Sequence, residues 1–488
     1  MKLRVSIILI WAALVALLVS RSLLIPEIDR DAPAALAQAR EESFYGIWSQ
    51  NQRIGTVENH FHPKPAGGFF LDQQARFQLN ILNQSQRIDL HLTADLDRRQ
   101  RLHAFSLSFR APFYSLDARG TVTGHTLSLV IDSGGDRRRE TIALSEAPFL
   151  ETQFRAYLLN PLPAPGHRVK IPFFDPLSLS RRETVVEYLG KQKILIKKRV
   201  VRLHHFRAHF SGIQIQFWLD EKGKVIKETS PAGFVFLAEP KFKARDIQAP
   251  RQELLRAVAV PFTGTFPSVK TPGEVVYRLR LPSGVPLDLN GGRQVFKNGD
   301  LRVTREDLPS DAVLGKNRSE CGAPEAMQPG RFVESNHKEI VARAKTIVGN
   351  EQSRLAKVRR LTAWVYTHID KRPVIGLPDA LATLHSRRGD CNEHAALFAA
   401  LARASRVPTR IVSGVVLYRQ RFYYHAWNEF CIDGRWVSVD STRNQLPADL
   451  THIRLVIGNL AEQVRIGALL GKLSITILPV KSDEQTGN

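Results

Sequence analysis

The sequence predicts an α+β protein, in which a C-terminal domain of helices and strands follows a large antiparallel β domain and an N-terminal transmembrane helix. Three observations predict this class. Apolar and polar residues alternate from about Ser43 to Glu239, helical periodicity begins near residue 337, and a largely apolar run covers residues 5–19. Alternation with a period of two is typical of a sheet with one buried face, and an apolar stripe at helical spacing indicates an amphipathic helix.

The N-terminal run is flanked by positive charge. Lys2 and Arg4 precede it, and it reaches a bilayer-spanning length only if it is counted through Ile25 with Arg21 at the far interface. The positive start predicts a cytoplasmic N-terminus and an exported bulk. We therefore expect residues 1–25 to be an uncleaved signal anchor, single-pass in a bacterial inner membrane, with the bulk of the chain in the periplasm. A cleaved signal peptide and a secreted periplasmic protein are the alternative.

Residues 26–42 then form a juxtamembrane spacer, and residues 43–248 form the antiparallel β-rich domain. Alternating apolar residues mark its strands: Ile88, Leu90, Leu92, Ala94 and Leu96; Phe105, Leu107 and Phe109; Leu127, Leu129 and Ile131. Residues 249–334 are rich in proline and glycine and contain only short strand-like pieces. They predict a connector or a small β subdomain.

The chain is markedly basic, with a formal net charge of +22 and a dense stretch of cations from Lys191 to Arg207. Nucleic acid is not expected as a partner, because the sequence contains no nucleic-acid-binding motif and an exported chain rarely meets DNA. The solvated face of a sheet is the preferred interpretation of this stretch. Attraction to anionic lipid headgroups or acidic envelope polymers is the alternative.

The C-terminal domain is expected over residues 335–480, with a disordered tail at 481–488. Two amphipathic helices, His337–Val348 and Glu351–Ile369, open it, and a short helix starts at Pro378 and Asp379. A further strong helix former runs from Asn392 to Ala404, directly after the breaker Gly389. Cys391 therefore falls at a helix N-terminus. The unpaired N–H groups there are expected to favour the thiolate and to stabilise an oxyanion.

A hairpin is predicted downstream, with Asp433-Gly434 as its turn between Phe422–Phe430 and Trp436–Val439. If Ile432 pairs with Arg435, His425 and Asp440 become diagonal neighbours on one face of the hairpin. Cys391, His425 and Asp440 together supply a thiol, a base and an orienting carboxylate, which is the minimum set for attack on an acyl carbon. Each residue taken alone is more often an ordinary core or surface position.

These motifs resemble the transglutaminase-like superfamily from about Ser335 to Gly458. The resemblance rests on Gly389-Asp390-Cys391 with Glu393, on Arg403-Ala404 with Pro408 and Arg410, on His425-Ala426-Trp427, on Asp433-Gly434-Arg435-Trp436 and on Val439-Asp440 with Thr442. It implies a papain-like core with Cys391 as nucleophile, His425 as base and then acid, and Asp440 as orienter. The chain departs from the family at Asn392 and Ser441, where animal and many bacterial relatives carry tryptophan and proline.

Glu393 and Trp427 are candidate substrate-binding or supporting residues, with ordinary helix and core positions as the alternative. The chain has three cysteines, and if Cys391 is the nucleophile, Cys321 and Cys431 could pair in an oxidising compartment. For Cys431 a buried, unpaired strand residue is the preferred interpretation. No cluster has zinc or calcium spacing, so no metal and no cofactor are expected.

The triad and the resemblance imply an enzyme that acts on amide or peptide bonds of a protein or peptide substrate through an acyl-thioester, and the N-terminal run would place it in the cell envelope. Water as acceptor makes it a peptidase or amidase, and a primary amine makes it a cross-linking acyltransferase; we favour hydrolysis. The alternative is a non-catalytic, membrane-anchored binding or scaffold protein that uses the β-rich domain. The oligomeric state stays open.

Overall fold

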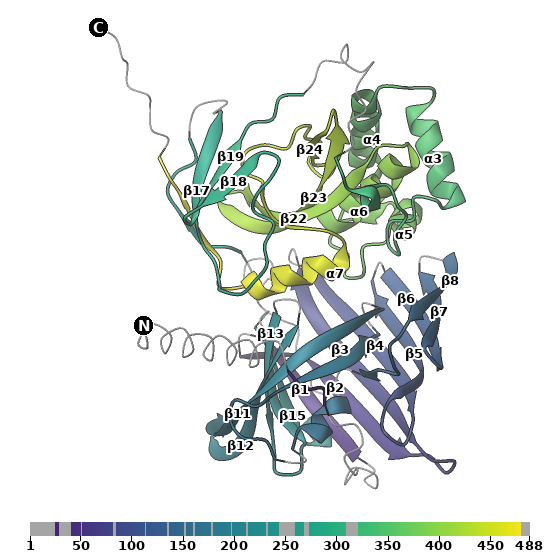
Figure 1. Cartoon of the computed structure of the whole chain (residues 1–488), viewed down its shortest axis with the longest axis vertical. Coiled ribbons are helices and arrows are strands. Elements are labelled where there is room, and N and C mark those ends of the chain that lie inside the picture. The colour runs from purple at the N-terminus through teal and green to yellow at the C-terminus, as the bar shows by residue number, and fades with distance from the viewer. Residues whose placement is uncertain are drawn as a thin grey trace, which may run out of the picture.

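The structure is a computed structural model that describes residues 25–28, 41–49, 51–81, 84–112, 114–133, 136–150, 153–159, 162–176, 179–196, 198–210, 213–230, 233–243, 259–267, 273–308 and 321–479. Its two halves lie one above the other in Figure 1. A large, strongly twisted sheet forms the lower half. A smaller domain that contains all the labelled helices except α7 forms the upper half, and α7 lies along the boundary.

The lower half is one sheet of fifteen strands in the order β8-β7-β6-β5-β4-β3-β2-β1-β15-β14-β13-β12-β11-β10-β9. Its two arms meet where β1 pairs with β15, and β9 pairs with β10 in parallel at one edge. The strands are β1 (Glu41–Ser49), β2 (Gln52–Pro63), β3 (Phe69–Ile81), β4 (Gln84–Leu96), β5 (Leu102–Ala111), β6 (Tyr114–Thr123), β7 (Thr126–Ser133), β8 (Asp136–Ala143), β9 (Phe149–Leu150), β10 (Arg168–Asp175), β11 (Ser180–Ile196), β12 (Arg199–Phe210), β13 (Ile213–Leu219), β14 (Val225–Thr229) and β15 (Phe234–Glu239).

The alternating residues in this half are strand residues with one buried face, as expected. Ile88, Ala94 and Leu96 of β4 are buried, and so are the alternating apolar residues of β5 and β7. Short 3-10 helices η1 (Gln153–Leu159) and η2 (Lys241–Lys243) accompany the sheet. The basic stretch lies on β11 and β12, where Lys191, Lys193 and Arg199 are exposed.

The expected fold class is wrong for the chain as a whole. Strands make up 52% of the structure and helices 17%, so the molecule is mostly β rather than α+β. The reason is the size of the continuous sheet: its strands contain many more residues than the helices of the C-terminal domain, which have 15 residues or fewer. The expected transmembrane helix is not supported either. Among the residues that the structure describes, no helix is both long and apolar enough to cross a bilayer. The apolar run at 5–19 lies outside these residues.

The upper half packs helices against a four-stranded sheet in the order β24-β23-β22-β25. Its core is formed largely by α6, whose central residues are fully buried, together with inward residues of β23. The elements are η4 (Pro324–Ala326), α3 (Lys338–Val348), α4 (Arg354–His368), β20 (Asp370–Lys371), α5 (Ala380–Ser386), β21 (Arg388–Gly389), α6 (Cys391–Ala404), β22 (Thr409–Tyr418), β23 (Arg421–Ile432), β24 (Arg435–Val439), β25 (Ile453–Ile457), α7 (Leu460–Gln463) and η5 (Val464–Leu469). The predicted helices are therefore confirmed to within a few residues.

The connector and the C-terminus meet in a five-stranded sheet in the order β16-β26-β17-β19-β18. Its strands are β16 (Phe262–Thr263), β17 (Glu274–Arg280), β18 (Gln294–Lys297), β19 (Asp300–Thr304) and β26 (Ser474–Ile477). Because β26 pairs with both β16 and β17, the chain beyond β25 returns to the segment that precedes the helices.

The two halves are joined by polar and apolar contacts. Arg138 of β8 donates one hydrogen bond to Asp379 at 2.9 Å and another to the Glu334 carboxyl group. Leu377 lies in the core of the large sheet. Gly376 lies against the Tyr114 ring, so closely that a Cβ atom there would be 2.3 Å from the ring. The loop between β20 and α5 is therefore anchored in the β domain.

Candidate active site around Cys391, His425 and Asp440

Cys391 is the first residue of α6, as the sequence predicts. Asp390 caps the helix: its side chain accepts a hydrogen bond from the Asn392 N–H at 2.9 Å, while the Glu393 carboxylate accepts one from the Asp390 N–H at 2.9 Å. This reciprocal capping box fixes the direction in which the helix begins. Glu393, one of the supporting candidates, thus holds the helix start and is 4% exposed.

The chain that leads into Cys391 is held from the other side by β20. Lys371 pairs with Gly389, and the Arg372 N–H donates to the Gly389 carbonyl at 3.1 Å. Position 389 requires glycine, because a Cβ atom there would lie 2.3 Å from the Cβ of Glu393. The helix cap and this short parallel pair together fix the backbone on both sides of the thiol.

The hairpin that carries the other two candidates has the predicted register. Ile432 pairs with Arg435 and Asn428 with Val439, which places Asp440 directly after β24. His425 Nε2 donates a hydrogen bond to Asp440 Oδ2 at 2.9 Å. The structure therefore brings His425 and Asp440 together, although they are fifteen positions apart.

Asp440 is completely buried and saturated with hydrogen bonds. Its Oδ1 accepts from the backbone N–H groups of Thr442 at 2.8 Å and Arg443 at 3.2 Å, and its Oδ2 accepts from two histidines. Burial raises the pKa of this carboxyl, but the charge and hydrogen bond of His425 and the hydrogen bond of His452 outweigh burial and hold the pKa well below its usual value. Asp440 is therefore an ionised acceptor.

His452 is the residue that the sequence interpretation missed. It is fully buried, and its Nε2 lies 3.1 Å from Asp440 Oδ2 while its Nδ1 lies 2.9 Å from Asp449 Oδ1. The signal in the sequence is slight: a histidine at the start of an apolar strand, next to a loop whose path no local pattern predicts. His425, Asp440 and His452 also place one potential metal-ligand atom each within 4.8 Å of the others, although both imidazoles already hydrogen-bond to the carboxylate between them.

The Cys391 residue is partly buried and packs against the hydrophobic core of the domain. Burial raises the pKa of the thiol well above its usual value, the Asp390 carboxylate raises it further, and a hydrogen bond with the backbone of Ala426 lowers it. The expected preference for the thiolate is therefore not supported for the resting site, because burial and then the Asp390 carboxylate raise the pKa of the thiol. The contact with Ala426 places the sulfur beside the strand residue that follows His425.

Trp427, the other supporting candidate, is 2% exposed. Its ring stacks on the His425 ring with centroids 6.1 Å apart and meets the His452 ring edge-on at 5.2 Å. The Trp427 ring therefore packs against both histidine rings, and it lies in the core of the domain rather than on its surface.

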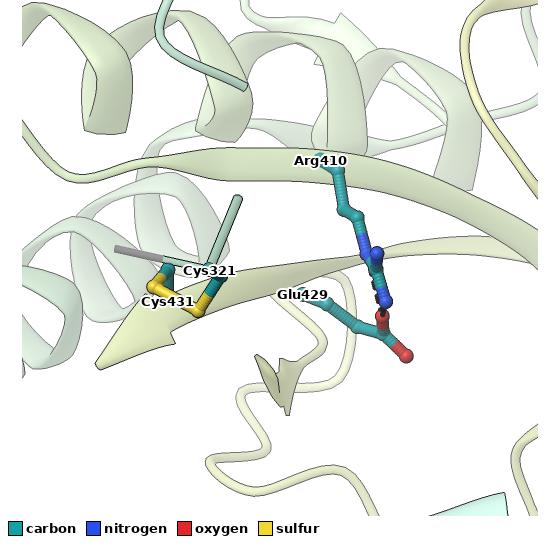
Figure 2. Close-up of a disulfide and its surroundings, with 4 residues drawn as sticks. All are labelled: Cys321, Arg410, Glu429 and Cys431. Carbon is teal, nitrogen blue, oxygen red and sulfur yellow. Dashed lines mark hydrogen bonds and ion pairs between the residues drawn. A yellow bond between two sulfur atoms is a disulfide. The ribbon is translucent and has the colours of Figure 1, made fainter. Parts of the chain in front are cut away.

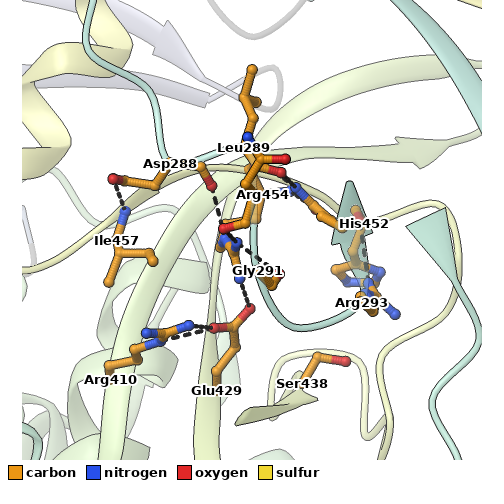
Figure 3. Close-up of polar contacts among 12 residues, drawn as sticks. Asp288, Leu289, Gly291, Arg293, Arg410, Glu429, Ser438, His452, Arg454 and Ile457 are labelled. Carbon is orange, nitrogen blue, oxygen red and sulfur yellow. Dashed lines mark hydrogen bonds and ion pairs between the residues drawn. The ribbon is translucent and has the colours of Figure 1, made fainter. Parts of the chain in front are cut away.

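A network of buried charges lies behind this site (Figure 3). Glu429 of β23 accepts hydrogen bonds from Arg410 Nε of β22 at 2.8 Å and from Arg454 Nη1 of β25 at 2.7 Å. Arg454 also donates to three carbonyl groups of the connector, those of Asp288, Asn290 and Gly291. The strand that carries His425 is thus tied to β22, to β25 and, through Arg454, to the connector.

A disulfide joins Cys321 to Cys431 across a separation of 110 residues (Figure 2). The preferred interpretation of Cys431 as an unpaired strand residue is therefore wrong. The reason is that Cys321 lies far away in the sequence but packs against the end of β23, a tertiary contact that no local pattern reports. Cys391 is the free cysteine of the chain.

Comparison with known families confirms the resemblance over this domain. Residues 341–441 match the transglutaminase-like superfamily model. None of the curated proteins matches the chain. The match supports a cysteine enzyme family for the C-terminal domain.

Several solved structures are similar to parts of the chain. A candidate cysteine protease from Cytophaga hutchinsonii is 17% identical, with a TM-score of 0.27, over 42% of this chain and 81% of its own. A beta-barrel-like protein of unknown function from Brucella abortus is 12% identical, with a TM-score of 0.32, over 42% of this chain and 97% of its own. A candidate protease from Parabacteroides distasonis is 12% identical, with a TM-score of 0.20, over 66% of this chain and 63% of its own.

Proposed function

We propose that this protein is a cysteine enzyme that cleaves or transfers acyl groups at amide or peptide bonds through an acyl-thioester on Cys391. The observation that carries the proposal is the bond from His425 Nε2 to the buried Asp440 carboxylate, next to a sulfur that contacts the following residue, Ala426. Asp440 occupies Nε2, so it selects the tautomer with a free lone pair on Nδ1. Nδ1 is the base atom in this proposal.

In this proposal the reaction begins with a protonated thiol, in line with the raised pKa of Cys391. His425 Nδ1 takes the thiol proton as the sulfur forms a bond to the carbonyl carbon, and the carbonyl oxygen becomes an oxyanion. The Asp390 side chain already accepts from the Asn392 N–H, so the Cys391 N–H at the first helical position is the donor proposed for the oxyanion. The C–N bond then breaks, the leaving amine takes the proton from His425, and a thioester remains.

The second half of the reaction releases the enzyme. His425 Nδ1 takes a proton from water as the water oxygen attacks the thioester, and the proton returns to the departing sulfur as the carboxylic acid forms. With a primary amine in place of water, the same steps give a new amide. We favour water as the acceptor, because a site reached from an aqueous compartment meets water in large excess over amines.

The disulfide supports an oxidising compartment, such as the bacterial envelope, as the place where the enzyme works. Cys321 and Cys431 are paired, and such bonds persist outside the reducing cytosol. In this proposal the substrate is a protein or peptide of the same compartment.

The test is active-site labelling with iodoacetamide and with a peptide-based electrophile, followed by mass spectrometry of the intact chain. We expect one adduct on Cys391 in the wild type and none in Cys391→Ala. His425→Ala should slow labelling by about 10²–10⁴-fold. Equal labelling rates in the wild type and His425→Ala would overturn the proposal and leave a scaffold or binding role for the domain.

A further inference from the structure

We propose that His452 is a cationic positioning residue, which bridges Asp440 to Asp449 and fixes the carboxylate that orients His425. This inference rests on the proposed function and deepens it. It adds to the site a residue that touches neither the thiol nor the substrate in the proposed mechanism, but acts on the reaction through Asp440.

The geometry leaves His452 little freedom. Both ring nitrogens face carboxylate oxygens at hydrogen-bond distance, 3.1 Å to Asp440 Oδ2 and 2.9 Å to Asp449 Oδ1. The side chain is fully buried, whereas that of Asp449 is 39% exposed. The chain of contacts thus runs from His425 through Asp440 and His452 to a carboxylate at the surface.

The two contacts define the charge on the ring. An ionised carboxylate only accepts hydrogen bonds. A neutral imidazole has one N–H group, so it could donate to Asp440 or to Asp449 but would turn the lone pair of its other nitrogen toward the remaining carboxylate. Burial lowers the pKa of His452, but the hydrogen bonds to Asp440 and Asp449 outweigh burial and raise it. Burial likewise raises the pKa of Asp449, and the hydrogen bond and charge of His452 lead the contacts that lower it below its usual range. The pKa of the imidazole is thus raised and the pKa values of its two carboxyl partners are lowered. This is the pattern of a carboxylate–imidazolium–carboxylate chain held by ion pairs.

Two further segments hold His452 in place. From β23, the Trp427 ring meets it edge-on at 5.2 Å and the His425 ring lies 5.7 Å away. Arg293, just before β18, donates from Nη2 to the His452 carbonyl at 3.1 Å. The titratable and charged groups that face this residue are therefore Asp440, Asp449 and His425 around its ring and Arg293 at its backbone.

A cation at this place has two consequences for the reaction. It holds Asp440 Oδ2 in one orientation, so that the carboxylate does not rotate away when His425 moves a proton. It also offsets part of the negative charge of Asp440, so replacing this cation with a neutral group strengthens the attraction of Asp440 for a proton held by His425.

The experiment compares His452→Gln and Asp449→Asn with the wild type, in the pH dependence of Cys391 alkylation and of peptide hydrolysis. Glutamine retains an N–H donor for Asp440 but carries no charge. We expect kcat to fall with KM unchanged, and the acidic limb of the pH–rate profile to move to higher pH by about one pH unit. Asp449→Asn weakens the cation without touching Asp440, so the same limb should move in the same direction by a smaller amount.

His204→Gln is the matched control. His204 is also a buried histidine with a carboxylate partner, Glu221 at 3.1 Å, but it lies on β12 in the large sheet. Its replacement should leave the pH profile unmoved. If His452→Gln fails to fold, Asp449→Asn still tests the proposal, because that side chain is partly exposed.

Two failures are distinguishable. If Cys391→Ala or His425→Ala keeps activity, the proposed function is wrong. If those variants are inactive while the profiles of His452→Gln and Asp449→Asn coincide with the wild type, the enzyme stands and the role of His452 is overturned.

Discussion

Asp390 has two opposing effects on the site. As the cap of α6 it accepts the Asn392 N–H at 2.9 Å and stabilises the helix start, which places Cys391. The same carboxylate, second to burial, raises the pKa of the neighbouring thiol. A protonated thiol is a poor nucleophile and a poor target for oxidation. The resting site is therefore protected, and its reactivity depends on His425.

Replacing Asp390 with asparagine separates the two effects, because asparagine also caps helices well but carries no charge. The pKa of Cys391 should fall, so the thiolate forms at lower pH. We expect faster alkylation by iodoacetamide near neutral pH, measured as the rate of loss of free thiol between pH 6 and 10. Asp390→Ala, which loses the cap as well, serves as the comparison. A pH profile for Asp390→Asn that coincides with the wild type would contradict this account of the charge.

At the scale of elements, the hairpin β23–β24 shows what local pattern predicts well. Asp433-Gly434 defines the turn, the turn defines the register, and the register places His425 and Asp440 on one face. The start of α6 is predictable for the same reason, since Gly389 and the helix-forming run after it are local signals. The contact of His452 with Asp440 was not predicted, and a Cys321–Cys431 pair was only the less favoured alternative. These partners lie 12 and 110 residues apart in the sequence and meet through tertiary packing.

Glu429 is the element-scale link, because its carboxylate ties β23 to the adjacent strand β22 and to β25 on the far side of β22. Burial raises the pKa of its carboxyl, but Arg454 and Arg410 outweigh burial and lower it. Glu429→Gln leaves the buried Arg454 and the partly buried Arg410 without a counter-charge. We expect a loss of about 3–5 kcal/mol in the free energy of unfolding, measured in urea. Since the folded-state pKa is depressed, this contribution is present above the ordinary glutamate pKa and is lost as the pH falls through the depressed value.

Glu274→Gln is a suitable control, because Glu274 pairs with Arg302 at 3.1 Å on the surface, where both side chains are more than one-third exposed. Such pairs contribute about 0–1 kcal/mol. Equal destabilisation by the two substitutions at neutral pH would show that the buried network does not hold the strands.

For the whole molecule, the sequence predicted the β region and the C-terminal domain. It did not predict how much of the chain the large sheet takes up, or the contacts that join the two halves. Period-two alternation correctly indicated an antiparallel β region, yet it carries no information on how many strands join one sheet. The helical patterns of the C-terminal domain, which carries the family resemblance, led to the α+β class. The joint depends on single contacts such as Arg138 with Asp379, 241 positions apart, which no periodicity encodes.

That joint is expected to respond to pH through Glu334. Burial, and then the neighbouring Asp379 carboxylate, raise the pKa of Glu334, while Arg138 lowers it less strongly. An acid whose pKa is raised by folding keeps its proton in the folded state after the unfolded state has lost it. Its contribution to stability is therefore largest below the ordinary glutamate pKa and declines as the pH rises through the raised value.

Glu334→Gln removes this titration while keeping a group that accepts from Arg138. Urea unfolding of the wild type and the variant across pH 4 to 9 should give a difference in free energy that grows with pH in favour of the variant. Arg138→Met should have the opposite effect on the pH dependence of the free energy of unfolding. Removing the cation raises the pKa of Glu334 further, so the loss of stability with rising pH continues to higher pH. A constant difference between Glu334→Gln and the wild type over this range would mean that Glu334 is already ionised in the folded protein. The joint would then be held by an ordinary ion pair with Arg138, and the two halves would separate only as the pH falls.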